Sequence, residues 1–265
     1  MATIREYLVE MFNKVLAKTI TREEGTMLLN DLVKRDKVTT LKEIASLIRT
    51  PPPGVFPKTI LHTVVLANNK VFNDLLIASL DHRDESVTIL AAEGLAKLRT
   101  DDAKEVLKGH IDSDIYHVRK ASAAALVMGF GKEGVEILKK HVLTHPEPFY
   151  RLTSVMAIIG AGAMGKQALL EILATGDVPA IESVAEGLAD APVDFDEEEI
   201  PTLIEAMVAA ADNEKFEAVE RLLGVLGSLG SKAARYEQYL SVFLESPSPA
   251  VREAATTAVR RIRYS

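Results

Sequence analysis

The sequence predicts an all-α protein in which similar helical hairpins stack on one another behind a helical segment at the N-terminus. The main observation is an internal period of 30 to 38 residues, marked by stripes of aliphatic side chains. The second is composition: the chain has 265 residues, of which 48% are hydrophobic but only 5% aromatic. The core is therefore built mainly from Leu, Ile, Val and Ala, and the chain is long enough to bury a sizeable one.

The first 50 residues lie outside this period and predict helices of their own. The three expected helices span about residues 4–18, 22–35 and 41–49. Thr21 with Glu24, and Thr40 with Glu43, have the capping-box spacing that begins a helix. The prolines of residues 51–54 then end the third helix.

This organisation predicts two parts, an N-terminal segment (1–50) and a repeat segment (55–265). A stack of hairpins needs a polar end to stay soluble, so we expect residues 1–50 to cap the first hydrophobic face of the repeats. The alternative is that they form a separate docking module.

The period is anchored on six aliphatic, small or aromatic positions separated by 31, 32, 30, 38 and 33 residues. They are Val87, Val118, Tyr150, Ala180, Ala218 and Val251. The residue eight positions after each anchor is always aliphatic, as in Leu95, and the residue seven positions after is Gly or Ala in five of six cases, as in Gly94. A small residue within an apolar stripe lets a neighbouring helix approach closely, so each stripe predicts a helix that packs on the next hairpin.

Residues 114–121 (DIYHVRKA) and 246–255 (SPSPAVREAA) resemble the first helix of HEAT-like repeats, particularly the short phycobilisome-lyase type. Residues 226–230 (LGSLG) resemble the turn between the two helices of such a repeat. The resemblance runs from about Asp81 to Ile262, with a degenerate unit before it over residues 57–80. It implies a right-handed α-solenoid of about six HEAT-like hairpins, a fold that mostly serves as an adaptor surface.

The arginine of that signature is matched at three positions, Arg119, Arg151 and Arg252. We expect these side chains to pair with Asp or with backbone carbonyls between repeats and to have a structural role.

The net charge of −7 comes from one segment, because residues 151–230 contain 4 basic and 15 acidic residues. Such a field repels phosphate backbones, so we expect no nucleic-acid partner. The chain has no Cys, which excludes thiolate metal sites and thiol nucleophiles and fits a reducing compartment. The longest apolar run, Val155–Gly165, is far shorter than the ~20 residues that span a bilayer. These features, with a start that lacks an apolar signal region, predict a soluble, cytoplasmic protein without membrane insertion.

Residues 160–165 (GAGAMG), taken alone, resemble the glycine-rich phosphate loop of a dinucleotide fold. They follow Val155–Ile159, however, which falls in register with the other repeats, and no β-rich segment flanks them. A phosphate loop needs a βαβ unit to orient it, so we expect a turn between two helices and no nucleotide cofactor.

The histidines lie in one third of the chain, at His62, His82, His110, His117, His141 and His145. His110 and His141 occupy the same place in neighbouring repeats, and His145 could join them with Asp112 or Asp114. A metal site needs three or four converging ligands, and the chain has neither an H-E-x-x-H motif nor a His-Glu dipeptide like those of the di-iron HEAT-repeat hydroxylases. We expect ordinary histidines at helix ends and no metal.

A long acidic loop over residues 190–201 accounts for the 38-residue step. Its acids are Asp194, Asp196, Glu197, Glu198 and Glu199. They could bind a basic tail or a hard cation such as Ca²⁺. The favoured interpretation is structural, because acids are stabilised at a helix N-terminus and Asp196 with Glu199 has capping spacing.

The leading functional hypothesis is a non-catalytic scaffold that binds another protein on the concave face of its second helices. Candidate contacts on those helices are Lys104, Lys108, Lys139, Lys140, Gln167, Glu171, Tyr236 and Tyr239. The alternative, which the resemblance alone implies, is a chromophore (bilin) lyase-like factor or another enzyme-accessory subunit. No nucleophilic catalytic set is recognisable. A DNA glycosylase is disfavoured because the chain lacks Trp and its second half is acidic.

Overall fold

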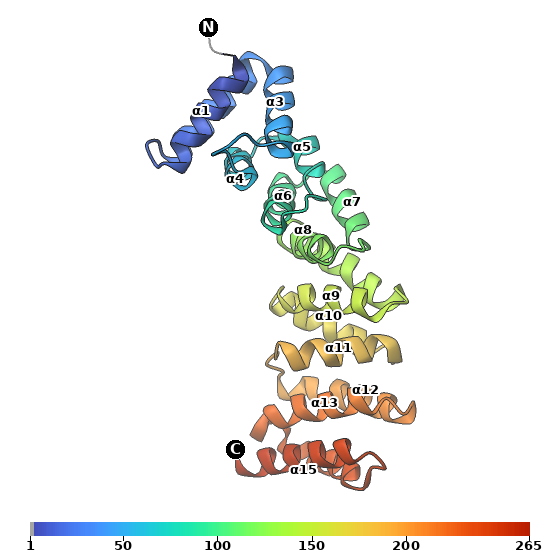
Figure 1. Ribbon diagram of the computed structural model, residues 1–265. Coiled ribbons are helices and arrows are strands. Elements are labelled where there is room, and N and C mark those ends of the chain that lie inside the picture. Colours follow the sequence, from blue (N-terminus) through green and yellow to red (C-terminus); the bar gives the residue numbers. More distant parts are fainter. Residues whose placement is uncertain (1–2) are drawn as a thin grey trace. The chain divides into compact units, whose positions relative to one another are not determined.

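The computed structural model describes residues 3–265, which are helical throughout and contain no β-strand. Figure 1 shows the helices following one another in chain order. The chain divides into two compact units, an N-terminal unit (Met1–Phe130) and a C-terminal unit (Gly131–Ser265). The predicted all-α repeat architecture is confirmed. The division at residues 1–50 and 55–265 differs from these units and stays a prediction.

The N-terminal unit contains α1 (Ile4–Leu16), α2 (Arg22–Arg35), α3 (Lys37–Arg49), α4 (Pro57–Ala67), the 3₁₀ turn η1 (Lys70–Phe72), α5 (Asn73–Ile77), α6 (Glu85–Leu98), α7 (Asp101–His110) and the first part of α8 (Tyr116–Thr144). The three helices expected before residue 50 are present. Helices α2 and α3 both pack on α4, and α4 packs on α6.

The helix starts agree with the sequence at α2 and differ at α3 and α7. The Thr21–Glu24 capping box is formed, but α3 begins at Lys37, three residues before Thr40, because the Asp36 side chain caps the Thr39 N–H at 3.0 Å. Thr40 is instead buried inside the helix, and its hydroxyl donates to the Leu32 carbonyl at 3.3 Å. In α7 the cap is Thr100, not Asp102.

Helix α8 is interrupted at Gly131, where the first unit gives way to the second. Its φ of 52° and ψ of −122° are not helical, and glycine reaches this region at little cost. Gly131 therefore separates the two helices of this hairpin. Among residues 3–265, no helix is both long enough and apolar enough to cross a bilayer.

The C-terminal unit contains the second part of α8, α9 (Pro148–Ile159), α10 (Ala163–Leu173), α11 (Val178–Asp190), the 3₁₀ turn η2 (Glu197–Glu199), α12 (Ile200–Asp212), α13 (Phe216–Ser228), η3 (Gly230–Tyr236), α14 (Glu237–Ser241), η4 (Val242–Glu245) and α15 (Pro249–Tyr264). Its first helices form a row in which α9 packs on α11, α11 on α13 and α13 on α15. The second helices are α10 and α12, and the short segments η3, α14 and η4 follow α13.

The aliphatic stripes form the core of both units, as the period predicts. Every residue eight positions after an anchor is at most 6% exposed, and Tyr150 is the only anchor that is not fully buried. The small residues allow the close approach: a Cβ on Gly94 would lie 2.8 Å from Leu76 Cδ2, and one on Gly187 would lie 2.5 Å from Val155 Cγ1.

Residues 160–165 form the turn between α9 and α10, as their repeat register indicates. Gly162 has a φ of 62°, and a Cβ on Gly165 would meet the Ile158 carbonyl oxygen. These glycines therefore close a tight helix–helix turn, and the phosphate-loop interpretation is excluded by the helix that precedes them.

Candidate protein-binding surface

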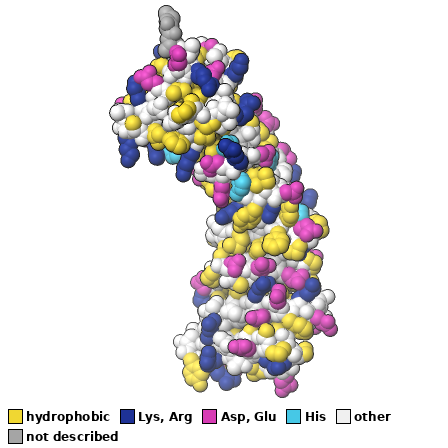
Figure 2. Space-filling model, in the orientation of Figure 1, with side chains coloured by type: hydrophobic (Ala, Val, Ile, Leu, Met, Phe, Trp, Pro, Cys, Tyr) yellow, Lys and Arg dark blue, Asp and Glu magenta, His cyan; other side chains and the backbone are white. Residues whose placement is uncertain are grey.

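The second-helix candidates of the C-terminal unit form a polar network between neighbouring hairpins. Lys139 Nζ lies 2.7 Å from a carboxylate oxygen of Glu136 and 2.6 Å from one of Glu171, and Gln167 donates to Glu171 at 3.2 Å. Hydrogen bonds that Lys139 donates to these acids raise the pKa of Lys139, and the same bond lowers the pKa of Glu171. Figure 2 shows acidic and basic side chains interspersed over the visible face of this unit. The network thus holds both signs of charge in fixed positions.

Three other candidates remain more open to solvent. Lys140, on the exposed side of α8, and Gln167 are both classed as exposed, and Tyr239 on α14 is 50% exposed. Tyr236 is half-buried, and its hydroxyl lies 3.4 Å from the Glu197 carbonyl oxygen. Tyr236 therefore also fastens the acidic loop.

The candidates of the N-terminal unit lie on α7 and make local ion pairs. Lys104 lies 3.4 Å from Asp101 and 6.0 Å from the centre of the Phe130 ring, and Lys108 lies 3.1 Å from Glu105. The side chain of Lys104 is only 17% exposed, whereas that of Lys108 is 52% exposed, so Lys108 is the more accessible of the two.

The acidic loop between α11 and α12 is anchored by one buried side chain and by its own cap. Phe195 is fully buried. The Glu199 carboxylate accepts the Asp196 N–H at 2.7 Å, which closes the expected capping box at the start of η2.

Three cations from neighbouring hairpins neutralise most of this loop. Lys166 on α10 lies 2.8 Å from Asp196 and 2.9 Å from Glu199. Lys232 lies 2.7 Å from Asp194, and Arg235 lies 2.9 Å from Glu197. Glu198 is exposed. The structural interpretation of the acids therefore has direct support, and of the five acids over residues 194–199 only Glu198 makes no ion pair within residues 3–265.

Sequence reasoning missed Lys166, Lys232 and Arg235, although the repeat period carried the signal. The pairs Lys139–Glu171, Lys166–Asp196 and Lys232–Asp194 are separated by 32, 30 and 38 residues, which are the spacings of the anchors. Opposite charges one period apart were thus a sequence indication of contacts between hairpins.

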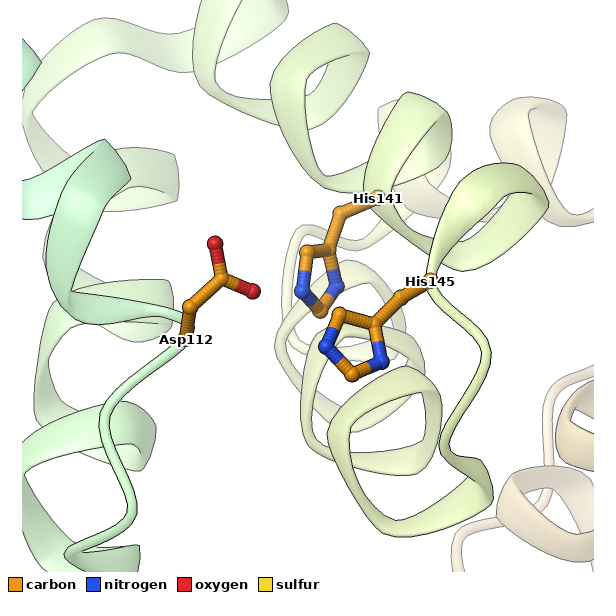
Figure 3. Close-up of side chains that lie close together, drawn as sticks. All are labelled: Asp112, His141 and His145. Atoms are coloured by element: carbon orange, nitrogen blue, oxygen red, sulfur yellow. The ribbon is translucent and has the colours of Figure 1, made fainter.

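The histidines satisfy local hydrogen bonds. His141 is 8% exposed, and its Nδ1 lies 2.9 Å from Ser154 Oγ. The His145 ring lies 4.8 Å from the His141 ring and stacks on Tyr150 at 4.6 Å, and its Nδ1 accepts the Glu147 N–H at 3.1 Å. Figure 3 shows His141 and His145 side by side at the end of α8; Asp112, labelled with them, belongs to the N-terminal unit.

The other histidines lie in the N-terminal unit with separate partners. His110 Nδ1 lies 2.8 Å from the Val106 carbonyl oxygen, and His117 Nε2 lies 3.3 Å from that of His82. Burial lowers the pKa of His62, and the charge of Arg22 lowers it further. His110 lies at the end of α7 and His117 at the start of α8, whereas His62 lies in the middle of α4.

The comparison that decides the family concerns the centre of the chain. Residues 73–159 match the family model of HEAT repeats, and they cover α5 to α9. This segment consists of HEAT repeats. The finer likeness to the phycobilisome-lyase type stays a prediction.

Several solved structures align with this chain over most of its length. Human deoxyhypusine hydroxylase in complex with glycerol is 16% identical, with 99% of this chain and 98% of that chain covered and a TM-score of 0.38. A designed armadillo repeat protein is 17% identical, with 84% and 99% covered and a TM-score of 0.27. An engineered protein is 18% identical, with 99% and 97% covered and a TM-score of 0.30. No curated protein matches the chain.

The signature arginines of the HEAT repeats bind the turn that precedes their own helix. Arg119, Arg151 and Arg252 each donate to the carbonyl six residues before them, at 2.7, 2.9 and 2.6 Å. Arg119 and Arg151 are 6% and 5% exposed. The expected pairing with carbonyls is confirmed, and these residues stabilise the connections between hairpins.

Proposed function

We propose that the protein is a non-catalytic scaffold that binds another protein on the second helices of its hairpins. The observation that carries this proposal is the HEAT-repeat segment, because HEAT repeats commonly mediate protein interactions. A stack of hairpins presents an extended surface whose side chains come from successive repeats.

The contact residues we propose are those on the second helices and on the acidic loop. Their geometry favours binding because Lys139 is held between carboxylates of two helices and Lys166 between two carboxylates of the acidic loop. Side chains that are already ordered lose less conformational entropy when a partner binds. Gln167 belongs to this network and is exposed, and Lys140 and Tyr239 are further exposed candidates. Glu198 adds an accessible negative charge for a basic partner, and the lack of Cys supports a cytoplasmic setting.

Site-specific photo-crosslinking tests the surface without knowledge of the partner. A photoreactive amino acid replaces Gln167 or Tyr239, which are exposed second-helix positions, and in a matched variant it replaces the exposed Glu23 on α2. In extracts of the native organism, we expect the same adduct, identified by mass spectrometry, from Gln167 and Tyr239 but not from Glu23. An adduct from Glu23 alone would place the contact on the N-terminal helices and contradict the proposal.

A further inference from the structure

A groove lies between α13 and α15, on the row of first helices rather than on the second helices. Its volume is about 290 Å³. Gly224, Ala254 and Thr257 form its small-residue floor, Glu220 and Glu253 lie at one end, and Arg261 lies at the other.

Gly224, like Gly109 of α7, has no close neighbour, unlike the glycines of this chain that face an adjacent helix. A Cβ on Gly227, one turn later in α13, would lie 2.7 Å from the Ala258 Cα, whereas a Cβ on Gly224 would have no heavy atom within 4 Å. Glycine in a helix interior is less favourable than Ala by roughly 0.5–1 kcal/mol. The helix therefore carries a destabilising residue whose one visible effect is to deepen the groove.

The two glutamates occupy equivalent positions of successive repeats. Glu220 lies two residues after the anchor Ala218, and Glu253 two residues after the anchor Val251, so both carboxylates reach the same end of the groove. Both are exposed, and within residues 3–265 neither makes an ion pair; the corresponding Glu182 of α11 is paired with Lys215 at 3.2 Å. The pair thus presents two uncompensated negative charges beside an apolar floor.

We propose that this groove binds an extended segment of a partner protein that carries a basic side chain followed by an acidic one. An arginine suits the first position, because its guanidinium can bridge two carboxylates while its aliphatic stem covers Gly224 and Ala254. Arg261 lies eight residues after Glu253, which is about 12 Å along the helix axis. That distance spans about four residues of an extended peptide, so the acidic group lies about four residues after the arginine and binds Arg261.

A peptide titration of the full chain, followed by the backbone amide signals in NMR spectra, tests the groove. The probe is acetylated Arg-Ala-Ala-Ala-Asp, and the control peptide has Gln in place of Arg. We expect the probe, and not the control, to shift the amide signals of residues 220–224 and 253–261. The variant E220Q/E253Q should weaken binding by about tenfold, as should Gly224→Leu, which fills the floor.

Two controls keep the outcome decisive. Glu205→Gln changes an exposed acid of the second helix α12 and should leave binding unchanged. Thermal unfolding confirms that Gly224→Leu is folded, and E220Q/E253Q tests the charges without changing the shape of the groove. The proposal would be overturned if both peptides gave equal shifts, or if the probe gave no shifts. It would also be overturned by shifts confined to α10 and α12, or by unchanged binding of the probe to E220Q/E253Q. Shifts confined to α10 and α12 would place the peptide on the second helices instead; the other outcomes do not bear on that surface, because the crosslinking positions lie outside the groove.

Discussion

Arg151 on α9 donates a hydrogen bond from Nε to the Oγ of Ser183 on α11, across 2.9 Å. Its Nη1 also donates to the carbonyls of His145 and Pro146, at 2.9 and 2.8 Å. Arg151 and Ser183 are only 5% and 2% exposed. One buried cation thus ties the turn before its own helix to the first helix of the next repeat.

We expect Arg151→Ala to lower the free energy of unfolding by about 2–3 kcal/mol, because it leaves two partly buried carbonyls and the buried Ser183 hydroxyl without their charged donor. Arg252→Ala is the matched control, since Arg252 holds the equivalent turn but is exposed. The decrease in the free energy of unfolding in Arg252→Ala should be about 1 kcal/mol or less. Urea unfolding measures both, and equal losses would show that burial of Arg151 adds nothing.

Gly224 and Gly227 provide a second pair of substitutions within α13. Gly227→Ala should destabilise the protein by about 1–3 kcal/mol, because the new methyl group would overlap the α15 backbone at Ala258. Gly224→Ala should instead stabilise it by about 0.5–1 kcal/mol, because its Cβ would meet open space. Thermal unfolding of both variants shows whether each substitution raises or lowers the stability of the protein. A loss of stability in Gly224→Ala would mean that its surroundings are filled.

The contact of Lys166 with Asp196 predicts a measurable carboxyl titration. The hydrogen bond from Lys166 holds the pKa of Asp196 below its ordinary value of 3.8. Because that pKa is lowered on folding, the contact stabilises the protein above pH 3.8 and its contribution disappears as the pH falls through the folded-state pKa. In Lys166→Gln, we expect the pKa of Asp196, followed by carboxyl carbon NMR, to rise toward the ordinary value.

Arg263→Gln is the control for that titration. Arg263 lowers the pKa of Glu237 by the same kind of bond, so its replacement should raise the pKa of Glu237 and leave that of Asp196 unchanged. If Asp196 titrates identically in the wild type and in Lys166→Gln, the conclusion that Lys166 of α10 anchors the acidic loop is wrong.

Removal of residues 1–50 should damage the N-terminal unit. Helices α2 and α3 pack on α4, where Ile60 and Leu61 are fully buried, and so are Leu29 of α2 and Leu47 of α3. Exposing these side chains removes about 25 cal/mol per Å² of hydrophobic stabilisation. We expect the truncated chain to associate in size-exclusion chromatography and to unfold at a lower temperature. A monomeric truncated chain with unchanged unfolding would favour the docking module.

Helix starts show how far local sequence reasoning extends. Thr21 and Ser248 cap their helices as their spacing predicts, because a cap needs only groups within three residues. Thr40 has the same spacing, yet it lies inside α3, where its hydroxyl reaches the Leu32 carbonyl of the preceding helix. Two possible caps, Asp36 and Thr40, lay close together in the sequence, and packing of α3 against its neighbours selected the first.

The candidate surface shows the same limit of local sequence reasoning. The sequence placed Lys139 and Glu171 on second helices but did not pair them, and it did not identify Lys166 as the partner of the acidic loop. Long side chains have many rotamers, so which acid a lysine meets depends on how the hairpins stack and not on its local sequence.

The amino-acid sequence alone determined the repeat, its helices and its buried stripes, because helix formation and the burial of aliphatic residues follow from spacing within a few turns. Tertiary structure decided which charges meet across hairpins and where a groove remains, as between α13 and α15. Gly224 and Gly227 show the reason: the two glycines are three residues apart in one helix, but only the helix packed beside them makes one a close contact and leaves the other open.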